Sequence, residues 1–285
     1  MKPIRIVEVG PRDGLQNEKG IIPTDTKIAF VDALSEAGLD EIEVSSFVSP
    51  RWIPQLADAD EVFRRIARRP GVQYMALVPN EAGLARAVAA RADKIAVFTA
   101  ASETFNRTNI NASIAESIER LRPVVRQAAV PVRGYVSTAF HCPYEGPIGP
   151  EAVMPVVQSL LDLGCVELSI GDTIGKATPD EVSTLLEHLL PVVGVDRLAM
   201  HFHDTFGRAA ANAERSAALG IRVFDASAGG IGGCPYAPGA TGNVATQALV
   251  ALFGNRTTID RSALDRAAAI VRPYLNGPTA APTAD

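Results

Sequence analysis

Short runs of β-branched residues alternate with longer segments rich in alanine and leucine along most of the chain. The short runs are typical of strands. In the longer segments, such as 25–38 and 150–164, apolar residues recur at helical spacing, and several begin at Thr, Asp or Pro and end at Gly. Gly38, Gly164 and Gly220 each stand where a helix is expected to end. Strands are expected at residues 4–9, 41–47, 72–78, 94–100, 132–138, 166–171, 198–203 and 223–228.

These eight strand–helix repeats predict a (β/α)8 TIM barrel of class α/β. Such a barrel typically takes about 250 residues, close to the length that the repeats occupy. A doubly wound open sheet is the alternative, but the turn after its first strand usually carries a glycine-rich dinucleotide motif, which the segment GPRDGLQNE lacks. We therefore expect one catalytic barrel domain over residues 1–275 and a flexible tail over residues 276–285. In a barrel, chemistry gathers at the carboxyl ends of the strands.

Composition narrows the functional classes. Of the 285 residues, 47% are hydrophobic and 21% are charged, which favours a large core and argues against disorder. The formal net charge of −5 gives no sign of a basic surface for nucleic acid. We find no apolar stretch long enough to span a membrane, no signal peptide, and three cysteines without a disulfide framework. We expect a cytoplasmic protein that binds neither nucleic acid nor a membrane.

Unusual polar residues lie at or just beyond the expected strand ends. Because these ends share one rim, we expect the side chains to face a common site. They are Arg12, Asp13 and Gln16 after the first strand, Glu43 and Ser46 in the second, Tyr135 in the fifth, Asp172 after the sixth, His201 and His203 in the seventh, and Cys234 in the glycine-rich segment 229–243.

Two of the four histidines, His201 and His203, are separated by one residue in an expected strand. Side chains at i and i+2 point to the same face about 6–7 Å apart, so both imidazoles can reach one divalent cation. Asp13 is a suitable third ligand, and two imidazoles with carboxylate oxygen and water fit Mn²⁺ or Mg²⁺ better than a closed zinc site. Alternatively, the histidines pack inside the barrel with satisfied ring nitrogens. Asp204 either caps the next helix or supports the site.

Three further residues have competing interpretations. Arg12 either forms a surface ion pair or provides a fixed guanidinium that stabilises an oxyanion formed in the reaction. Glu43 lies in an apolar strand, where an unpaired carboxylate is costly, so it should pair with Arg12, with a metal-bound water, or within an ion-pair layer inside the barrel. The glycine-rich segment is either a flexible connector or a mobile lid that presents the Cys234 thiol to the site.

Six segments together resemble the 3-hydroxy-3-methylglutaryl-CoA (HMG-CoA) lyase family, within the DRE-TIM metallolyase superfamily. They occur in order from the first strand to the loop after the eighth: GPRDGLQNE, SSFVSPRWIPQLAD, VRGYVSTAFHCPYEG, GDTIGKATP, HFHDTFG and GGIGGCPYAPGATGN. The resemblance implies a homodimeric (β/α)8 barrel that cleaves an acyl-CoA, HMG-CoA, into acetyl-CoA and acetoacetate. It also implies a requirement for Mg²⁺ or Mn²⁺ and for no redox cofactor.

The resemblance implies roles for individual residues. Arg12 matches the arginine that stabilises the enolate of the departing acetyl thioester. The family points to Asp13 or Cys234 as the general base, with His201 a candidate to protonate the acetyl carbanion. The implied metal ligands are Asp13, His201, His203 and Asn243, the catalytic residues Arg12, Asp13, Glu43, Asp172, His201 and Cys234, and the substrate-binding residues Arg12, Gln16, Ser46 and Tyr135.

The chain departs from the family pattern near the expected site. His141, preceded by Phe140, stands where a glycine usually comes before CPYEG, and Phe202 stands where a cysteine is frequent in the animal enzymes. Both changes could alter which acyl group fits, so one alternative is a lyase for a larger 3-hydroxy-3-alkylglutaryl thioester, such as an isoprenoid-chain homologue. The others are a synthase that condenses an acyl-CoA with a 2-keto acid, and a non-catalytic thioester-binding protein. Cys142 and Cys165 are interpreted as structural.

Overall fold

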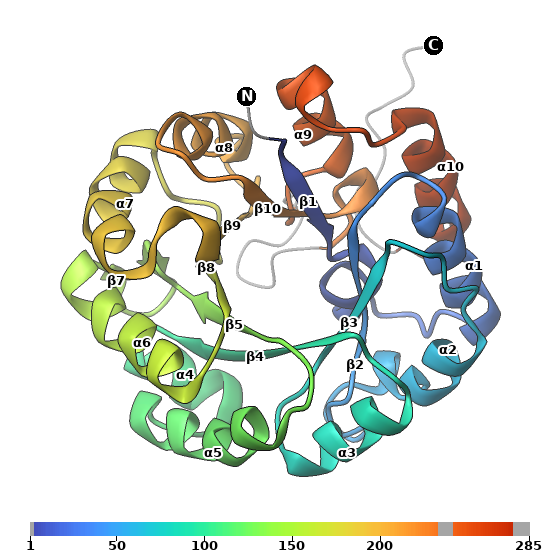
Figure 1. Ribbon diagram of the computed structural model, residues 1–285, viewed down its shortest axis with the longest axis horizontal. Coiled ribbons are helices and arrows are strands. Elements are labelled where there is room, and N and C mark those ends of the chain that lie inside the picture. The colour runs from blue at the N-terminus through green and yellow to red at the C-terminus, as the bar shows by residue number, and fades with distance from the viewer. Residues whose placement is uncertain (1–2, 233–241, 276–285) are drawn as a thin grey trace.

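The computed structural model describes residues 3–232 and 242–275, and within these the predicted (β/α)8 barrel is confirmed (Figure 1). Each expected strand is present: β1 (Arg5–Glu8), β2 (Glu41–Ser46), β3 (Gln73–Leu77), β4 (Lys94–Ala100), β5 (Val132–Ser137), β8 (Glu167–Asp172), β9 (Leu198–Phe202) and β10 (Val223–Ala226). Their order around the barrel is β1-β10-β9-β8-β5-β4-β3-β2, and β1 pairs in parallel with both β10 and β2 to close it.

Helices surround the barrel, and their ends follow sequence signals. Ser113 and Thr178 begin two of them with capping boxes, in which side chain and backbone satisfy each other's hydrogen bonds. Gly38, Gly164 and Gly220 end helical segments with φ of 83°, 112° and 111°, as expected. The helices are α1 (Thr24–Ser35), α2 (Ala59–Arg65), α3 (Glu81–Ala89), α4 (Glu103–Ile110), α5 (Ile114–Gln127), α6 (Pro150–Leu163), α7 (Pro179–Val193), α8 (Ala209–Ala218), α9 (Thr246–Phe253) and α10 (Arg261–Val271). Among the described helices, none is long and apolar enough to cross a membrane.

A small hairpin between β5 and α6 is absent from the sequence-based prediction. Its antiparallel strands are β6 (His141–Cys142) and β7 (Gly146–Pro147). The thiol of Cys142, a residue of β6, is buried 3.0 Å from Ser102 Oγ, and Cys165 is also buried and free. Their positions agree with the structural roles expected for both cysteines.

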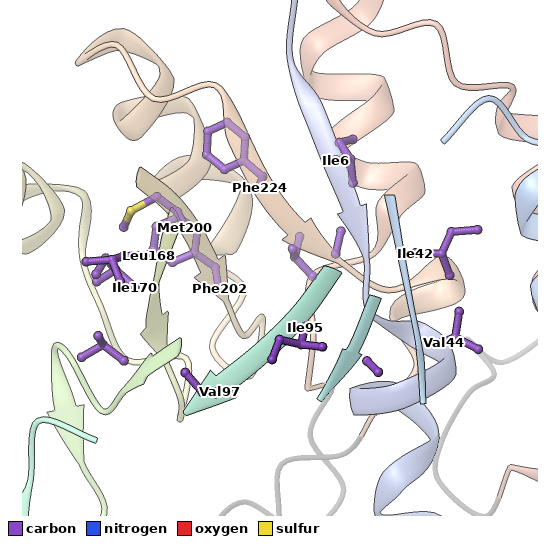
Figure 2. Close-up of a cluster of buried hydrophobic side chains, with 14 of the residues drawn as sticks. Ile6, Ile42, Val44, Ile95, Val97, Leu168, Ile170, Met200, Phe202 and Phe224 are labelled. Atoms are coloured by element: carbon purple, nitrogen blue, oxygen red, sulfur yellow. The ribbon is translucent and has the colours of Figure 1, made fainter. Parts of the chain in front are cut away.

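Side chains along the barrel strands alternate between two buried layers. The outward layer packs against the helices, and burying each aliphatic side chain of leucine size contributes about 1.5–3 kcal/mol relative to exposure. A slip of one residue would turn that layer inward, so the layer fixes the register. Outward residues include Ile6, Ile42, Val44, Ile95, Val97, Leu168, Ile170, Met200, Phe202 and Phe224 (Figure 2). An inward cluster contains Val7, Val9, Met75, Leu77, Ala96, Tyr135, Ala199 and Val223.

Charged residues also face the barrel interior, mostly near the amino ends of the strands. Lys94 Nζ lies 2.8 Å from Glu41 Oε1 and 2.9 Å from Glu167 Oε1. Arg133 lies between two carboxylates, with Nε 3.2 Å from Glu167 Oε1 and Nη2 2.6 Å from Asp225 Oδ1. A buried charge without a partner is strongly destabilising, so the pairing is what allows charge at this depth. We call the six residues involved the interior ion-pair layer: Arg5, Lys94, Arg133, Glu41, Glu167 and Asp225.

Candidate functional site

The site begins with a tight turn directly after β1. Residues 10–14 form a single π-helical turn. The backbone N–H groups of Arg12, Asp13 and Gly14 all donate to the carbonyl oxygen of Val9, at 3.2, 2.8 and 3.1 Å. This turn fixes the Arg12 and Asp13 side chains at the carboxyl end of the first strand, where the barrel fold places chemistry.

Glu8 and Gly14 hold this turn against the loop that follows β10. The fully buried Glu8 carboxylate accepts hydrogen bonds from the backbone N–H groups of Gly10 and Ala228, at 2.9 and 2.8 Å, and from the Thr246 hydroxyl at 2.7 Å. A Cβ on Gly14 would lie 3.0 Å from a carbonyl oxygen of the same loop, so glycine permits the close approach. Burial raises the pKa of Glu8 to about 7, although the three hydrogen bonds act in the opposite direction.

Arg12 links two carboxylates. Its Nε donates to Glu43 Oε2 and its Nη1 to Asp13 Oδ1, both at 2.7 Å. The Tyr135 hydroxyl also donates to Glu43 Oε2, at 3.2 Å, and the Tyr135 ring centroid lies 5.5 Å from Arg12 Cζ. Arg12 is 7% exposed, so the interpretation as a surface ion pair is wrong. The expected pairing of Glu43 with Arg12 is confirmed, and Glu43 is separate from the interior ion-pair layer.

Burial and pairing determine the charges in this group. Burial disfavours the Arg12 cation, but the charges of Glu43 and Asp13 outweigh it and raise the pKa of Arg12 above its usual value. Burial raises the pKa of Glu43, against the influence of Arg12. The other carboxylate oxygen, Glu43 Oε1, is buried and has no hydrogen-bond partner among the described residues. An unpaired buried acceptor costs about 1–3 kcal/mol, so the site favours a ligand or water that donates to this atom.

Asp13, His201 and His203 form a cluster beside Arg12. One potential ligand atom from each lies within 4.8 Å of the others, and the two imidazole centroids are 5.2 Å apart. Asn243 joins the cluster, since its Nδ2 donates to Asp13 Oδ2 at 2.9 Å and its backbone bridges that of His203. The structure thus brings together all four residues predicted to bind a cation, and we call them the cation cluster.

The chemistry of this cluster fits a divalent cation. Burial alone would raise the pKa of Asp13, but the charges of Arg12, His201 and His203 hold it well below its usual range, so the carboxylate stays ionised. Burial and the neighbouring His201 lower the pKa of His203 to about 4, which keeps its imidazole neutral near pH 7. His203 Nδ1 is buried without a hydrogen-bond partner among the described residues, so the alternative of satisfied ring nitrogens is wrong for this histidine. A neutral imidazole beside a carboxylate is suited to metal ligation.

Asp172 lies at the end of β8, next to the cation cluster. Its two carboxylate oxygens accept hydrogen bonds from the backbone N–H groups of Lys176 and Ala177, both at 3.0 Å, and its carbonyl oxygen accepts one from His203 N at 3.4 Å. Burial raises the pKa of Asp172 to about 6, against the two hydrogen bonds. Its carboxylate therefore shapes the turn before α7, and its predicted catalytic role stays a prediction.

The remaining predicted residues are placed as follows. Ser46 is fully buried, and its hydroxyl accepts a hydrogen bond from Val48 N at 3.2 Å; its substrate contact stays a prediction. Gln16 is half-buried in the segment after the first turn, and its role is likewise untested. Asp204 Oδ1 accepts a hydrogen bond from the N–H of Ala209, the first residue of α8, which agrees with the capping interpretation. Cys234 lies outside the described residues, as does the expected tail.

The two departures from the family pattern differ in their surroundings. His141 Nε2 lies 2.9 Å from Glu181 Oε1, and both residues line a pocket of about 280 Å³. Phe202 instead packs in the outward layer (Figure 2). Its ring centroid lies 6.3 Å from that of Phe140. Strand alternation places Phe202 on the face of β9 opposite to His201, so its ring does not point to the same side as the cation cluster, and its effect on the acyl group stays a prediction.

Asp225, which the sequence analysis did not identify, lies behind one of the histidines. Its Oδ2 is 3.3 Å from His201 Nδ1, and the two residues are register partners on β10 and β9. Burial alone would raise the pKa of Asp225, but Arg133 and His201 lower it to about 2. Burial disfavours the His201 imidazolium, yet the hydrogen bond and charge of Asp225 outweigh this and raise the pKa of His201. Alternation on β10, where Phe224 is outward, could have identified Asp225 as an inward carboxylate.

Comparisons with known proteins identify the family of this chain. A family model described as HMGL-like matches residues 3–271. The chain is 52% identical to the cytoplasmic 3-hydroxy-3-methylglutaryl-CoA lyase of Rattus norvegicus over 263 residues, which cover 90% of this chain and 77% of that one. The crystal structure of the HMG-CoA lyase from Brucella melitensis has a TM-score of 0.94 and 50% identity, covering 96% of this chain and 99% of that one.

A further solved structure was determined with ligands. It is an HMG-CoA lyase from Acinetobacter baumannii in complex with coenzyme A and 3-methylmalate. Its TM-score is 0.91 at 38% identity, and the match covers 96% of this chain and 92% of that one. With a family model matching nearly its whole length and relatives this similar, the chain belongs to the HMGL-like family, together with the HMG-CoA lyases.

Proposed function

We propose that this chain is a carbon–carbon lyase that cleaves HMG-CoA into acetyl-CoA and acetoacetate, with Mg²⁺ or Mn²⁺ held by the cation cluster. The observation that carries the proposal is the position of this cluster beside the buried Arg12–Glu43 pair at the carboxyl rim of the barrel. The names of the relatives support the substrate, and the A. baumannii complex supports an acyl-CoA ligand.

The reaction breaks the C2–C3 bond of the acyl group while the C3 hydroxyl loses its proton. A divalent cation held by Asp13, His201, His203 and Asn243 would polarise substrate oxygen atoms and make that hydroxyl easier to deprotonate. Arg12 is held by Glu43 and Asp13, and its fixed guanidinium stabilises the negative charge that develops on the oxygen of the departing acetyl thioester. The unpaired Glu43 Oε1 is available to accept a hydrogen bond from the substrate.

Two proton transfers complete the proposed reaction. The hydroxyl proton passes to Asp13 or Cys234, and the acetyl carbanion takes up a proton. The family resemblance suggests His201 for this second transfer, but the contact of its Nδ1 with Asp225 favours a role in the cation cluster instead. The overall change is redox-neutral, because one thioester of a 3-hydroxy acid becomes an acetyl thioester and a keto acid. The proposal therefore includes no redox cofactor.

The test measures acetoacetate release from HMG-CoA by purified, metal-stripped protein to which Mg²⁺ or Mn²⁺ is added back. We expect cation-dependent turnover that is lost in His203→Ala and retained in His188→Ala. His188 is a matched control because it lies on the exposed surface of α7, with Nδ1 2.8 Å from Thr184 O. Absence of turnover in folded, metal-loaded wild type would overturn the proposal, as would full turnover by His203→Ala.

The same assay separates the competing activities. A condensing synthase would consume acetyl-CoA together with a 2-keto acid, whereas the proposed lyase releases acetyl-CoA without one. Neither that activity nor a larger acyl substrate is favoured, because the matched relatives are named for HMG-CoA. The proposal also includes a homodimer located in the cytoplasm that binds neither nucleic acid nor a membrane, and light scattering of the purified protein tests the dimer.

A further inference from the structure

Asp225 contacts three side chains that come from three different strands. Its Oδ1 accepts a hydrogen bond from Arg133 Nη2 at 2.6 Å, and its Oδ2 accepts one from Ser169 Oγ at 2.7 Å. The same Oδ2 lies 3.3 Å from His201 Nδ1. Asp225 is 2% exposed, so these neighbours, rather than bulk water, satisfy its charge.

The interior ion-pair layer holds this carboxylate in place. Arg133 is completely buried and is itself paired with Glu167, so its position is fixed from the far side as well. An ionised carboxylate only accepts hydrogen bonds. Asp225 therefore presents an acceptor to His201 Nδ1, and that nitrogen has to carry a proton for the contact to form.

We propose that Asp225 is a positioning residue that holds the proton of His201 on Nδ1 and thereby leaves the Nε2 lone pair of that imidazole free for the cation. This inference rests on the proposed function, because it assumes that the cation cluster binds a divalent metal. It makes the two histidines unlike: Asp225 holds His201 through Nδ1, whereas His203 Nδ1 has no hydrogen-bond partner among the described residues.

The consequence is a link between the interior of the barrel and its catalytic rim. In Asp225→Asn, the amide keeps the shape of the side chain but can turn its carbonyl toward Arg133 and an N–H toward His201. Nδ1 would then accept, Nε2 would carry the proton, and the ring would lose its lone pair toward the cluster. Partners behind a metal-ligating histidine typically contribute about 10–100-fold to metal affinity.

The first experiment measures Mn²⁺ affinity from the electron paramagnetic resonance signal of free Mn²⁺. We expect Asp225→Asn to bind Mn²⁺ about 10–100-fold more weakly than wild type. Ser169→Ala is the matched control, because it removes a hydrogen bond from the same carboxylate oxygen and leaves the His201 contact intact; its affinity should stay within about twofold. Equal affinities of wild type and Asp225→Asn, or an equal loss in Ser169→Ala, would overturn the positioning role. Failure of wild type to bind Mn²⁺ would instead overturn the cation site.

The second experiment needs no substitution and so stands even if Asp225→Asn does not fold. Nitrogen-15 NMR of the imidazoles in metal-free wild type reports which nitrogen carries the proton, and four histidines make the spectrum tractable. We expect a protonated Nδ1 on His201 throughout the range from pH 7 to pH 9. An unprotonated Nδ1 on His201 in that range would refute the proposal, whatever the Mn²⁺ measurements give.

Discussion

Replacement of Glu8 by glutamine should remove a pH-dependent loss of stability. Burial raises the pKa of Glu8 from 4.5 to about 7, so between these values the folded protein binds more protons than the unfolded chain. Stability contributed by this group is therefore present at low pH and falls as the pH rises through about 7. At 1.36 kcal/mol per pH unit, the loss amounts to about 3 kcal/mol above pH 7.

The geometry at Glu8 suits an amide. Oε1 accepts both backbone N–H groups, so a glutamine oxygen can replace it, and the glutamine NH2 can donate to the Thr246 hydroxyl oxygen. Urea unfolding should give similar stabilities for wild type and Glu8→Gln near pH 5. The variant should become more stable than wild type by up to about 3 kcal/mol at pH 8.

The result that refutes this reasoning is specific. A difference between the two unfolding free energies that stays constant from pH 5 to pH 8 would show that Glu8 does not titrate in this window. Glu8→Ala is the control for the hydrogen bonds alone. It leaves two buried N–H groups without acceptors and should be destabilised at both pH values, by about 1–3 kcal/mol for each group.

Three further substitutions test other parts of the site. Arg12→Lys keeps the charge but loses the guanidinium, whose separate N–H groups bind two carboxylates. Steady-state kinetics should therefore show kcat about 100-fold lower. A decrease of threefold or less would contradict the role in stabilising the oxyanion. Gly14→Ala places a Cβ 3.0 Å from a carbonyl oxygen, which should shift the turn and displace the neighbouring Asp13. Titration should therefore show weaker Mn²⁺ binding, while circular dichroism should show that the barrel remains folded. Phe202→Leu should lower the free energy of unfolding by about 1–2 kcal/mol, because the ring packs in the outward layer. KM for HMG-CoA should stay unchanged, and a changed KM would indicate that the ring affects substrate binding.

The barrel was predictable because its signals are local and repeated. Each strand forms a short β-branched run, and glycines such as Gly164 end helices in a conformation that other residues rarely adopt. His201 and His203 were recognisable because the strand period places alternate side chains together, and the fold then directs Asp13 toward the same rim. The short hairpin between β5 and α6 was not predicted, since strands of two residues carry no periodicity.

An ion-pair layer inside the barrel was considered only for Glu43, and the six residues that form the interior ion-pair layer were missed for a different reason. Lys94 and Glu167 are buried in the barrel. In the sequence, however, a charged residue at the start of a strand looks the same whether it faces solvent or pairs with an opposite charge on another strand. The partners are distant in the chain: Arg133 and Asp225 are separated by 92 positions. Their pairing depends on the closed order of the strands, which only the assembled barrel supplies.

The balance of that layer restricts how the barrel can be altered. Three of its residues are cationic and three are anionic, so any single loss of charge leaves unequal numbers of cations and anions in the layer. Neutralising Lys94 and Glu41 together should be tolerated better than neutralising either alone. A designer who wishes to transplant this catalytic rim onto another barrel would have to move the layer beneath it as one set, because His201 is connected to it through Asp225.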